Sequence, residues 1–90
     1  MNKTAIITGG ATGIGFATAK ILAAKKYNVV IACRNIENIK QAKKEIKEID
    51  QNNSIEFQQC DVANINDIKN LFKFTVDKFQ QIDCLINAAA

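Results

Sequence analysis

Four short apolar runs alternate along the chain with three longer segments in which apolar residues recur every three or four positions. The second and fourth runs lack the alternation of a half-exposed strand, which is typical of parallel strands covered on both faces. The third run alternates apolar with polar residues, which favours an edge strand. The predicted strands are residues 3–8, 28–33, 55–60 and 84–87, and the predicted helices are residues 13–25, 36–50 and 65–80.

Each predicted helix has one apolar face that we expect to be buried, and two of the helices follow a residue that can cap the N-terminus. Asn35 and Asn64 precede the second and third helices, where an asparagine side chain can accept from the first N–H groups. The outer face of the second helix is lysine-rich, but Glu45 and Glu48 interrupt it, so we interpret it as solvated and not as a nucleic-acid site. The predicted core faces are Ile14, Ala17, Thr18, Ile21 and Leu22; Ile39, Ala42, Ile46 and Ile49; and Ile65, Ile68, Phe72, Val76 and Phe79.

This order of elements predicts an α/β fold, a partial Rossmann-type doubly wound parallel sheet. Right-handed crossovers give a β-α-β-α-β-α-β unit with strand order 3-2-1-4, the first two helices on one face and the third on the other. The fourth strand has the apolar pattern of an interior strand, but in this order it lies at an open edge of the sheet. A single helix would also have to cover one whole face of the sheet. We therefore expect the N-terminal portion of a longer protein, through truncation, an engineered boundary or a broken reading frame. Self-association through the exposed sheet face and the open fourth strand is a further expectation.

A length of 90 residues is enough for one small domain, residues 1–90. A hydrophobic fraction of 48% without proline favours a packed core, and a net charge of +3 suits an anionic ligand without requiring a nucleic acid. Three cysteines with no histidine and no C-x-x-C argue against zinc or disulfides, so Cys33, Cys60 and Cys84 are interpreted as small buried residues. Without a membrane-length apolar run or a signal peptide, we expect a cytoplasmic protein with no membrane partner.

Candidate chemistry is concentrated in residues 8–15, Thr-Gly-Gly-Ala-Thr-Gly-Ile-Gly, between the first predicted strand and helix. Glycines remove the side-chain bulk that keeps a ligand from the backbone, and a helix N-terminus offers free N–H groups to a phosphate. The motif lacks the lysine of a P-loop, which argues against phosphoryl transfer. A tight turn with close helix packing is the alternative interpretation of the same glycines.

The spacing T-G-x-x-x-G-x-G resembles the first turn of the short-chain dehydrogenase/reductase family. The resemblance implies that Gly9, Thr12, Gly13, Ile14 and Gly15 contact the diphosphate of a nicotinamide dinucleotide. It covers essentially the whole chain.

At the end of the second strand, an acid favours NAD and an arginine accommodates the 2′-phosphate of NADP. Arg34 occupies this position, which favours NADP over NAD, and the stretch Ala-Cys-Arg-Asn resembles NADP-preferring members related to retinol dehydrogenases and protochlorophyllide reductases. By the same resemblance, Asp61 and Val62 contact the adenine. Asn87 matches the first residue of the family's Asn-Asn-Ala-Gly signature near the cofactor ribose.

The family's catalytic groups, a Tyr-x-x-x-Lys pair and an upstream serine, have no match here. The chain's one tyrosine, Tyr27, is followed four residues later by Ile31. We therefore expect the NADP(H)-binding portion of an enzyme that transfers hydride between NADP(H) and an alcohol or carbonyl substrate, with no catalytic residue in these 90 positions. A non-catalytic nucleotide-binding module and an inactive truncated relic remain open as alternatives.

Overall fold

The computed structural model describes residues 2–47 and 54–88. All the strands and helices that the sequence predicts are present in these ranges, with ends that differ by one residue at most where the structure describes them. The predicted end of the second helix, residues 48–50, lies outside the described residues. The elements are β1 (Thr4–Thr8), α1 (Gly13–Ala24), β2 (Asn28–Cys33), α2 (Ile36–Lys47), β3 (Ile55–Gln59), α3 (Ile65–Phe79) and β4 (Cys84–Asn87).

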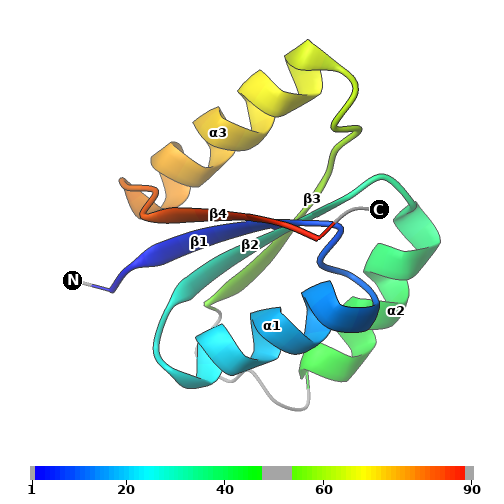
Figure 1. The fold of residues 1–90 in the computed structure, drawn as a ribbon, viewed down its shortest axis with the longest axis vertical. Helices are drawn as coiled ribbons and strands as arrows, with labels where there is room; N and C mark the ends of the chain where they lie inside the picture. Colours follow the sequence, from blue (N-terminus) through cyan, green and yellow to red (C-terminus); the bar gives the residue numbers. More distant parts are fainter. Residues whose placement is uncertain (1, 48–53, 89–90) are drawn as a thin grey trace.

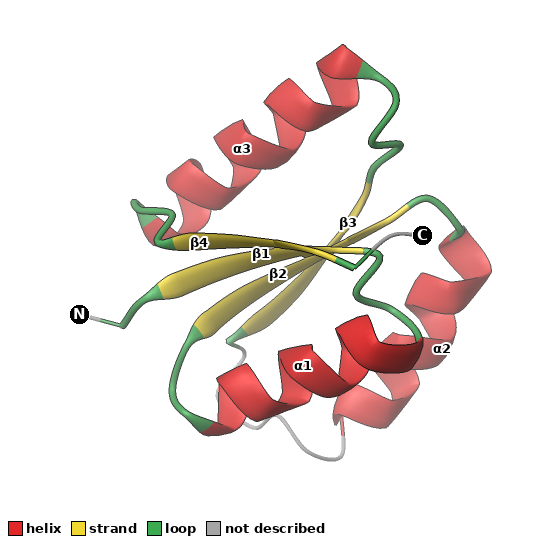
Figure 2. Cartoon of the chain, in the orientation of Figure 1, coloured by secondary structure: helices red, strands yellow, loops and turns green. Residues whose placement is uncertain are grey.

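The strands form one parallel sheet in the order β3-β2-β1-β4, as predicted (Figure 1). β1 pairs with β2 on one side, where Ile6 lies opposite Val30, and with β4 on the other, where Ile6 lies opposite Leu85. Helices α1 and α2 lie on one face of the sheet and α3 lies on the opposite face (Figure 2). The predicted Rossmann-type topology is confirmed.

Two apolar clusters follow from the alternation of side chains along the strands. One contains Ile7, Val29 and Ile31 and is closed by α1 and α2. The other contains Ile6, Val30 and Leu71 and is closed by α3. Because each central strand faces helices on both sides, β1 and the middle of β2 are buried throughout, which explains their continuous apolar runs.

The buried face of α1 differs from the predicted one. Ile14 is 84% exposed and Ile21 is also exposed, whereas Gly15, Phe16 and Ala19 are buried. The reason is that α1 is apolar nearly all round, so helical spacing alone did not identify the contacting face. The small residues Gly15 and Ala19 allow the closest approach to the sheet, and they decide which face is buried.

The predicted core stripe of α3 is also wrong in part. Phe72 and Val76 are exposed and Ile65 is 65% exposed, while the fully buried positions are Leu71 and Thr75. The Thr75 hydroxyl donates to the Leu71 carbonyl oxygen at 2.8 Å, which allows a polar residue to be buried at this contact. The apolar stripe is therefore wider than the contact that α3 makes with the sheet.

Strand β4 is not covered on both faces, in contrast to the prediction. Leu85, on the α3 side of the sheet, is 54% exposed, while Cys84 and Ile86 are half-buried. The interpretation of the cysteines as buried holds for Cys60 and only in part for Cys33 and Cys84; all three are free thiols. Within the described residues, no helix has the length and apolar character that crossing a membrane requires.

Candidate functional site

A cleft of about 770 Å³ opens at the carboxyl ends of the strands. In a doubly wound sheet this is the edge where ligands bind, because neighbouring helices leave the sheet toward opposite faces there. Of the residues singled out from the sequence, all but Asn87 line this cleft: Gly9, Thr12, Gly13, Ile14, Gly15, Arg34, Asp61 and Val62. The fold thus brings together residues from three separate loops.

The glycines of the first turn have two different tasks. Gly9 and Gly13 have φ values of 70° and 58°, which L side chains rarely adopt, and a Cβ on Gly13 would meet no atom within 4 Å. A Cβ on Gly15 would instead lie 2.5 Å from the Gly9 carbonyl oxygen. Gly13 therefore keeps backbone open to the cleft, whereas Gly15 serves close packing of α1 on its own loop. The close-packing interpretation of the motif is therefore confirmed at Gly15, whereas phosphate binding at this turn stays a prediction.

Helix α1 presents an uncapped N-terminus to this cleft. Thr12 occupies the N-cap position in extended conformation, but its side chain accepts no hydrogen bond from the helix, and the first turn holds no acidic residue. The other two described helices are capped as predicted by asparagine side chains, Asn35 on α2 and Asn64 on α3. The free N–H groups and positive dipole end of α1 fit a bound anion such as a diphosphate.

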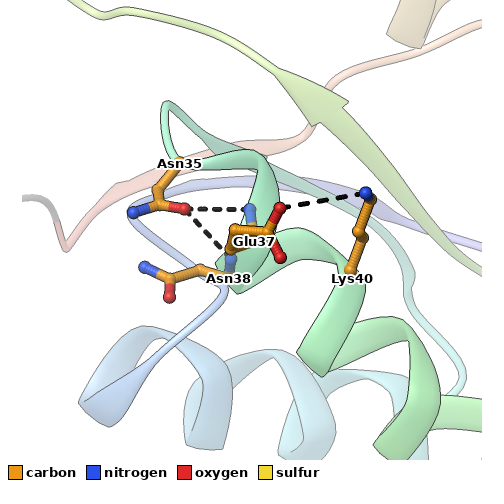
Figure 3. A network of polar contacts seen from close by, with 4 residues as sticks. All are labelled: Asn35, Glu37, Asn38 and Lys40. Carbon is orange, nitrogen blue, oxygen red and sulfur yellow. Dashed lines mark hydrogen bonds and ion pairs between the residues drawn. The ribbon is translucent and has the colours of Figure 1, made fainter.

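At the end of β2, Arg34 is exposed and has no ion-pair partner among the described residues. The first turn of α2 follows directly (Figure 3), where the Asn35 side-chain oxygen accepts from Glu37 N at 2.9 Å and from Asn38 N at 3.2 Å. The Glu37 carboxylate is paired with Lys40 at 3.8 Å. Arg34 thus lines the cleft without an ion pair to any described residue.

Asp61 stands where β3 ends, at the opposite side of the cleft from the glycine turn. Its Oδ1 accepts from Ala63 N at 2.9 Å, and its own N–H donates to the Asp67 carboxylate at 2.9 Å. The preceding residue, Cys60, is 3% exposed, and its N–H donates to the Cys33 carbonyl oxygen at 3.0 Å. Burial raises the pKa of the Cys60 thiol, and the carboxylates of Asp67 and Asp61 raise it further.

Asn87 is the last residue of β4, and its side chain contacts the neighbouring strand β1. The Thr8 hydroxyl donates to Asn87 Oδ1 at 2.7 Å, and the next residue, Ala88, lines the cleft and donates its N–H to the Thr8 carbonyl oxygen at 2.9 Å. The sequence did not point to Asn38, which also lines the cleft. Its place in the first turn of the helix that follows Arg34 was the available signal.

Comparison with known proteins identifies the family of the chain. The sequence profile of the family described as short chain dehydrogenase matches residues 3–90. The chain is 35% identical to retinol dehydrogenase 13 of Mus musculus over 88 residues, covering 98% of this chain and 26% of that protein. It is 40% identical to human polyprenol dehydrogenase, covering 98% and 27%. It is also 37% identical to human 15-hydroxyprostaglandin dehydrogenase [NAD(+)], covering 97% and 33%. The chain thus spans between a quarter and a third of these relatives.

Solved structures share the fold. Menthone neomenthol reductase from Mentha piperita superposes with a TM-score of 0.90 at 33% identity, covering 100% of this chain and 32% of that one. A variant of actinorhodin polyketide ketoreductase with NADPH gives a TM-score of 0.89 at 27% identity, covering 99% and 33%. Sequence profile, sheet order and glycine turn all agree, and the chain belongs to the short chain dehydrogenase family.

Proposed function

We propose that residues 1–90 form the NADP(H)-binding portion of an oxidoreductase that transfers hydride between NADP(H) and an alcohol or carbonyl substrate. The observation that carries this proposal is the uncapped N-terminus of α1, which opens with its positive-φ glycines on the same cleft as Arg34 and Asp61. When bound, the nicotinamide would supply the hydride. The chain's own residues bind and orient the other half of the cofactor.

Each part of the cofactor has a proposed partner. The diphosphate binds the first-turn N–H groups of α1 next to Gly13, and the adenine lies against Asp61 and Val62. Asn87 holds the adjacent ribose edge through its amide N–H groups, since Thr8 occupies its oxygen. An inactive relic is disfavoured, because Gly13, Asp61 and Val62 line one cleft of the four-stranded sheet.

Arg34 is proposed to select NADP over NAD by pairing with the 2′-phosphate. A guanidinium binds phosphate through two parallel N–H groups, whereas a carboxylate at the same position repels it. The name of one similar protein includes NAD(+), and one similar structure was solved with NADPH, so family membership alone does not decide the cofactor. The position of Arg34 at the cleft, without an ion pair to any described residue, supports the proposal.

The test is calorimetric titration of the chain with NADPH and NADH. We expect NADPH to bind more tightly to the wild type and the preference to reverse in Arg34→Asp. Lys3→Asp is the matched control, because it makes the same charge change at the opposite, amino-terminal edge of the sheet. An unchanged preference in Arg34→Asp would remove Arg34 from the assignment, and no binding of either dinucleotide would overturn the function itself.

Self-association through the α3 side of the sheet is also proposed. Its support is the exposed apolar side chains Ile65, Val76 and Leu85. Sedimentation should then give a mass above the 9.9 kDa of one chain, and Leu85→Lys should shift the population toward the monomer. A wild type that sediments as a monomer would contradict this proposal. The cytoplasmic location expected from the sequence stays a prediction.

A further inference from the structure

The proposed adenine side of the cleft is formed by the loop between β3 and α3. The turn begins at Asp61, whose carbonyl oxygen accepts from Asn64 N at 2.9 Å. Asn64 then caps α3 by accepting from Asn66 N at 2.9 Å and from Asp67 N at 3.2 Å. Every contact so far lies within the turn or fixes its far end. The near end of the turn, where the Asp61 side chain starts, needs a separate support.

Asp67 provides that support from the first turn of α3. It is the third residue of the helix, the position from which an acidic or amide side chain commonly reaches back to the N–H of the N-cap residue. Here the N-cap N–H of Asn64 is already held by the Asp61 carbonyl oxygen. The Asp67 carboxylate reaches further, and Oδ2 accepts from Asp61 N at 2.9 Å, six residues back in the chain.

We propose that Asp67 is a positioning residue for adenine recognition: by holding the Asp61 N–H, it fixes the Asp61 carboxylate at the wall of the cleft. The inference rests on the proposed function. Asp61 lines the cleft and Asp67 does not, so Asp67 acts through its neighbour. Leu71, fully buried one turn further along α3, anchors the helix that carries Asp67 to the sheet.

The geometry also says what Asp61 can recognise. Its Oδ1 is occupied by Ala63 N at 2.9 Å, which leaves Oδ2 as the acceptor for a ligand. A carboxylate oxygen accepts from the exocyclic amine of adenine, and it repels the carbonyl oxygen that hypoxanthine carries at the same position. The ratio of the affinities for the two bases therefore depends on whether the Asp61 carboxylate is held at the wall of the cleft.

The experiment compares the binding of NADPH with that of its hypoxanthine analogue, nicotinamide hypoxanthine dinucleotide phosphate in reduced form, to the full chain. A hydrogen bond to a charged group predicts a wild-type preference for NADPH on the order of tenfold to a hundredfold. Asp67→Ala should bring this ratio to near one while binding of the analogue changes little. Asp67→Asn keeps an acceptor oxygen and should restore most of the ratio.

Two controls separate positioning from general loosening. Asp77→Ala removes an exposed carboxylate from the same helix, where it pairs with Lys73, and should leave the ratio unchanged. Asp61→Ala should abolish the preference as Asp67→Ala does. A merely structural role of Asp67 would weaken both ligands equally and would not move their ratio.

The failures are distinguishable. If the wild type binds neither dinucleotide, the proposed function is overturned; if it binds both equally, the assignment of adenine to Asp61 is overturned. If it discriminates and Asp67→Ala discriminates as well, or if Asp67→Asn fails to restore the ratio, the positioning role alone is overturned. Should Asp67→Ala not fold, hydrogen exchange of the wild-type chain decides: the Asp61 amide must be protected, and exchange at the rate of a free loop amide would refute the proposal.

Discussion

Replacing Gly15 with alanine tests the packing of α1 on its own loop. An added Cβ would lie 2.5 Å from the Gly9 carbonyl oxygen, 2.9 Å from Gly10 Cα and 3.1 Å from the Ala88 Cβ. The first two of these are backbone atoms, which cannot rotate away as a side chain can. Helix α1 or the glycine turn must therefore shift. Overpacking of this kind lowers the free energy of unfolding by about 1–3 kcal/mol.

Gly13→Ala is the informative comparison, because its added methyl group has free space around it. Its φ of 58° strains any L residue by about 1–2 kcal/mol, without a steric clash. We expect Gly13→Ala to destabilise the chain less than Gly15→Ala, but to weaken NADPH binding directly, since the methyl group would enter the cleft. Gly15→Ala should weaken binding only through displacement of the turn.

The assay is urea unfolding followed by circular dichroism, together with NADPH titration of each variant. Ala17→Ser, which adds one atom at an exposed position of the same helix, should change stability by no more than about 0.5 kcal/mol. If Gly15→Ala unfolds at the wild-type urea concentration with an unchanged slope, the close contact with the Gly9 backbone does not exist as described, and the argument fails.

Three further changes should have measurable effects on stability. Asn35→Ala removes the cap of α2 and should lower the free energy of unfolding by about 1 kcal/mol in urea, whereas Asn35→Asp should retain most of it. Leu71→Ala, at a position with 0% exposure, should lower it by about 2–5 kcal/mol in the same assay. The pKa of the Cys60 thiol is raised above its ordinary value of 9.0, so the folded chain holds this proton more tightly than the unfolded chain does. The contribution to the free energy of unfolding is therefore full below pH 9 and is lost as the pH rises beyond it. Urea unfolding between pH 7 and 10 should show a shallower decline in Cys60→Ala than in the wild type, and equal declines would contradict this.

The topology was predictable because it depends on features that repeat along the chain. The continuous apolar run of β2 indicates a strand covered on both faces, although the same pattern in β4 was misleading, and the order of elements with right-handed crossovers leaves one sheet order. The caps Asn35 and Asn64 were predictable for a different reason: a cap is a contact over two or three residues, so the sequence alone contains all of its parts.

Helix faces were predictable only where the opposite face is polar. In α2, lysines and glutamates fill the outer side, and the predicted core positions Ile39, Ala42 and Ile46 are buried, while Ile49 lies outside the described residues. In α1 there is no such contrast. The contact face there is set by the steric limit at Gly15, a property of the folded turn that spacing does not contain.

In the candidate site, too, some features follow from neighbouring residues in the sequence and others only from the folded structure. Thr12 is a residue type that commonly caps helices, although the family resemblance assigned it to the diphosphate. In the structure that side chain does not cap, and the N–H groups remain open to the cleft. Asp67 is an acidic residue in the first turn of α3, where an acid is common. Its carboxylate accepts from the N–H of Asp61 and not from that of the N-cap residue, Asn64. In both cases the deciding fact is which backbone donor is already occupied, and only the folded loops determine that.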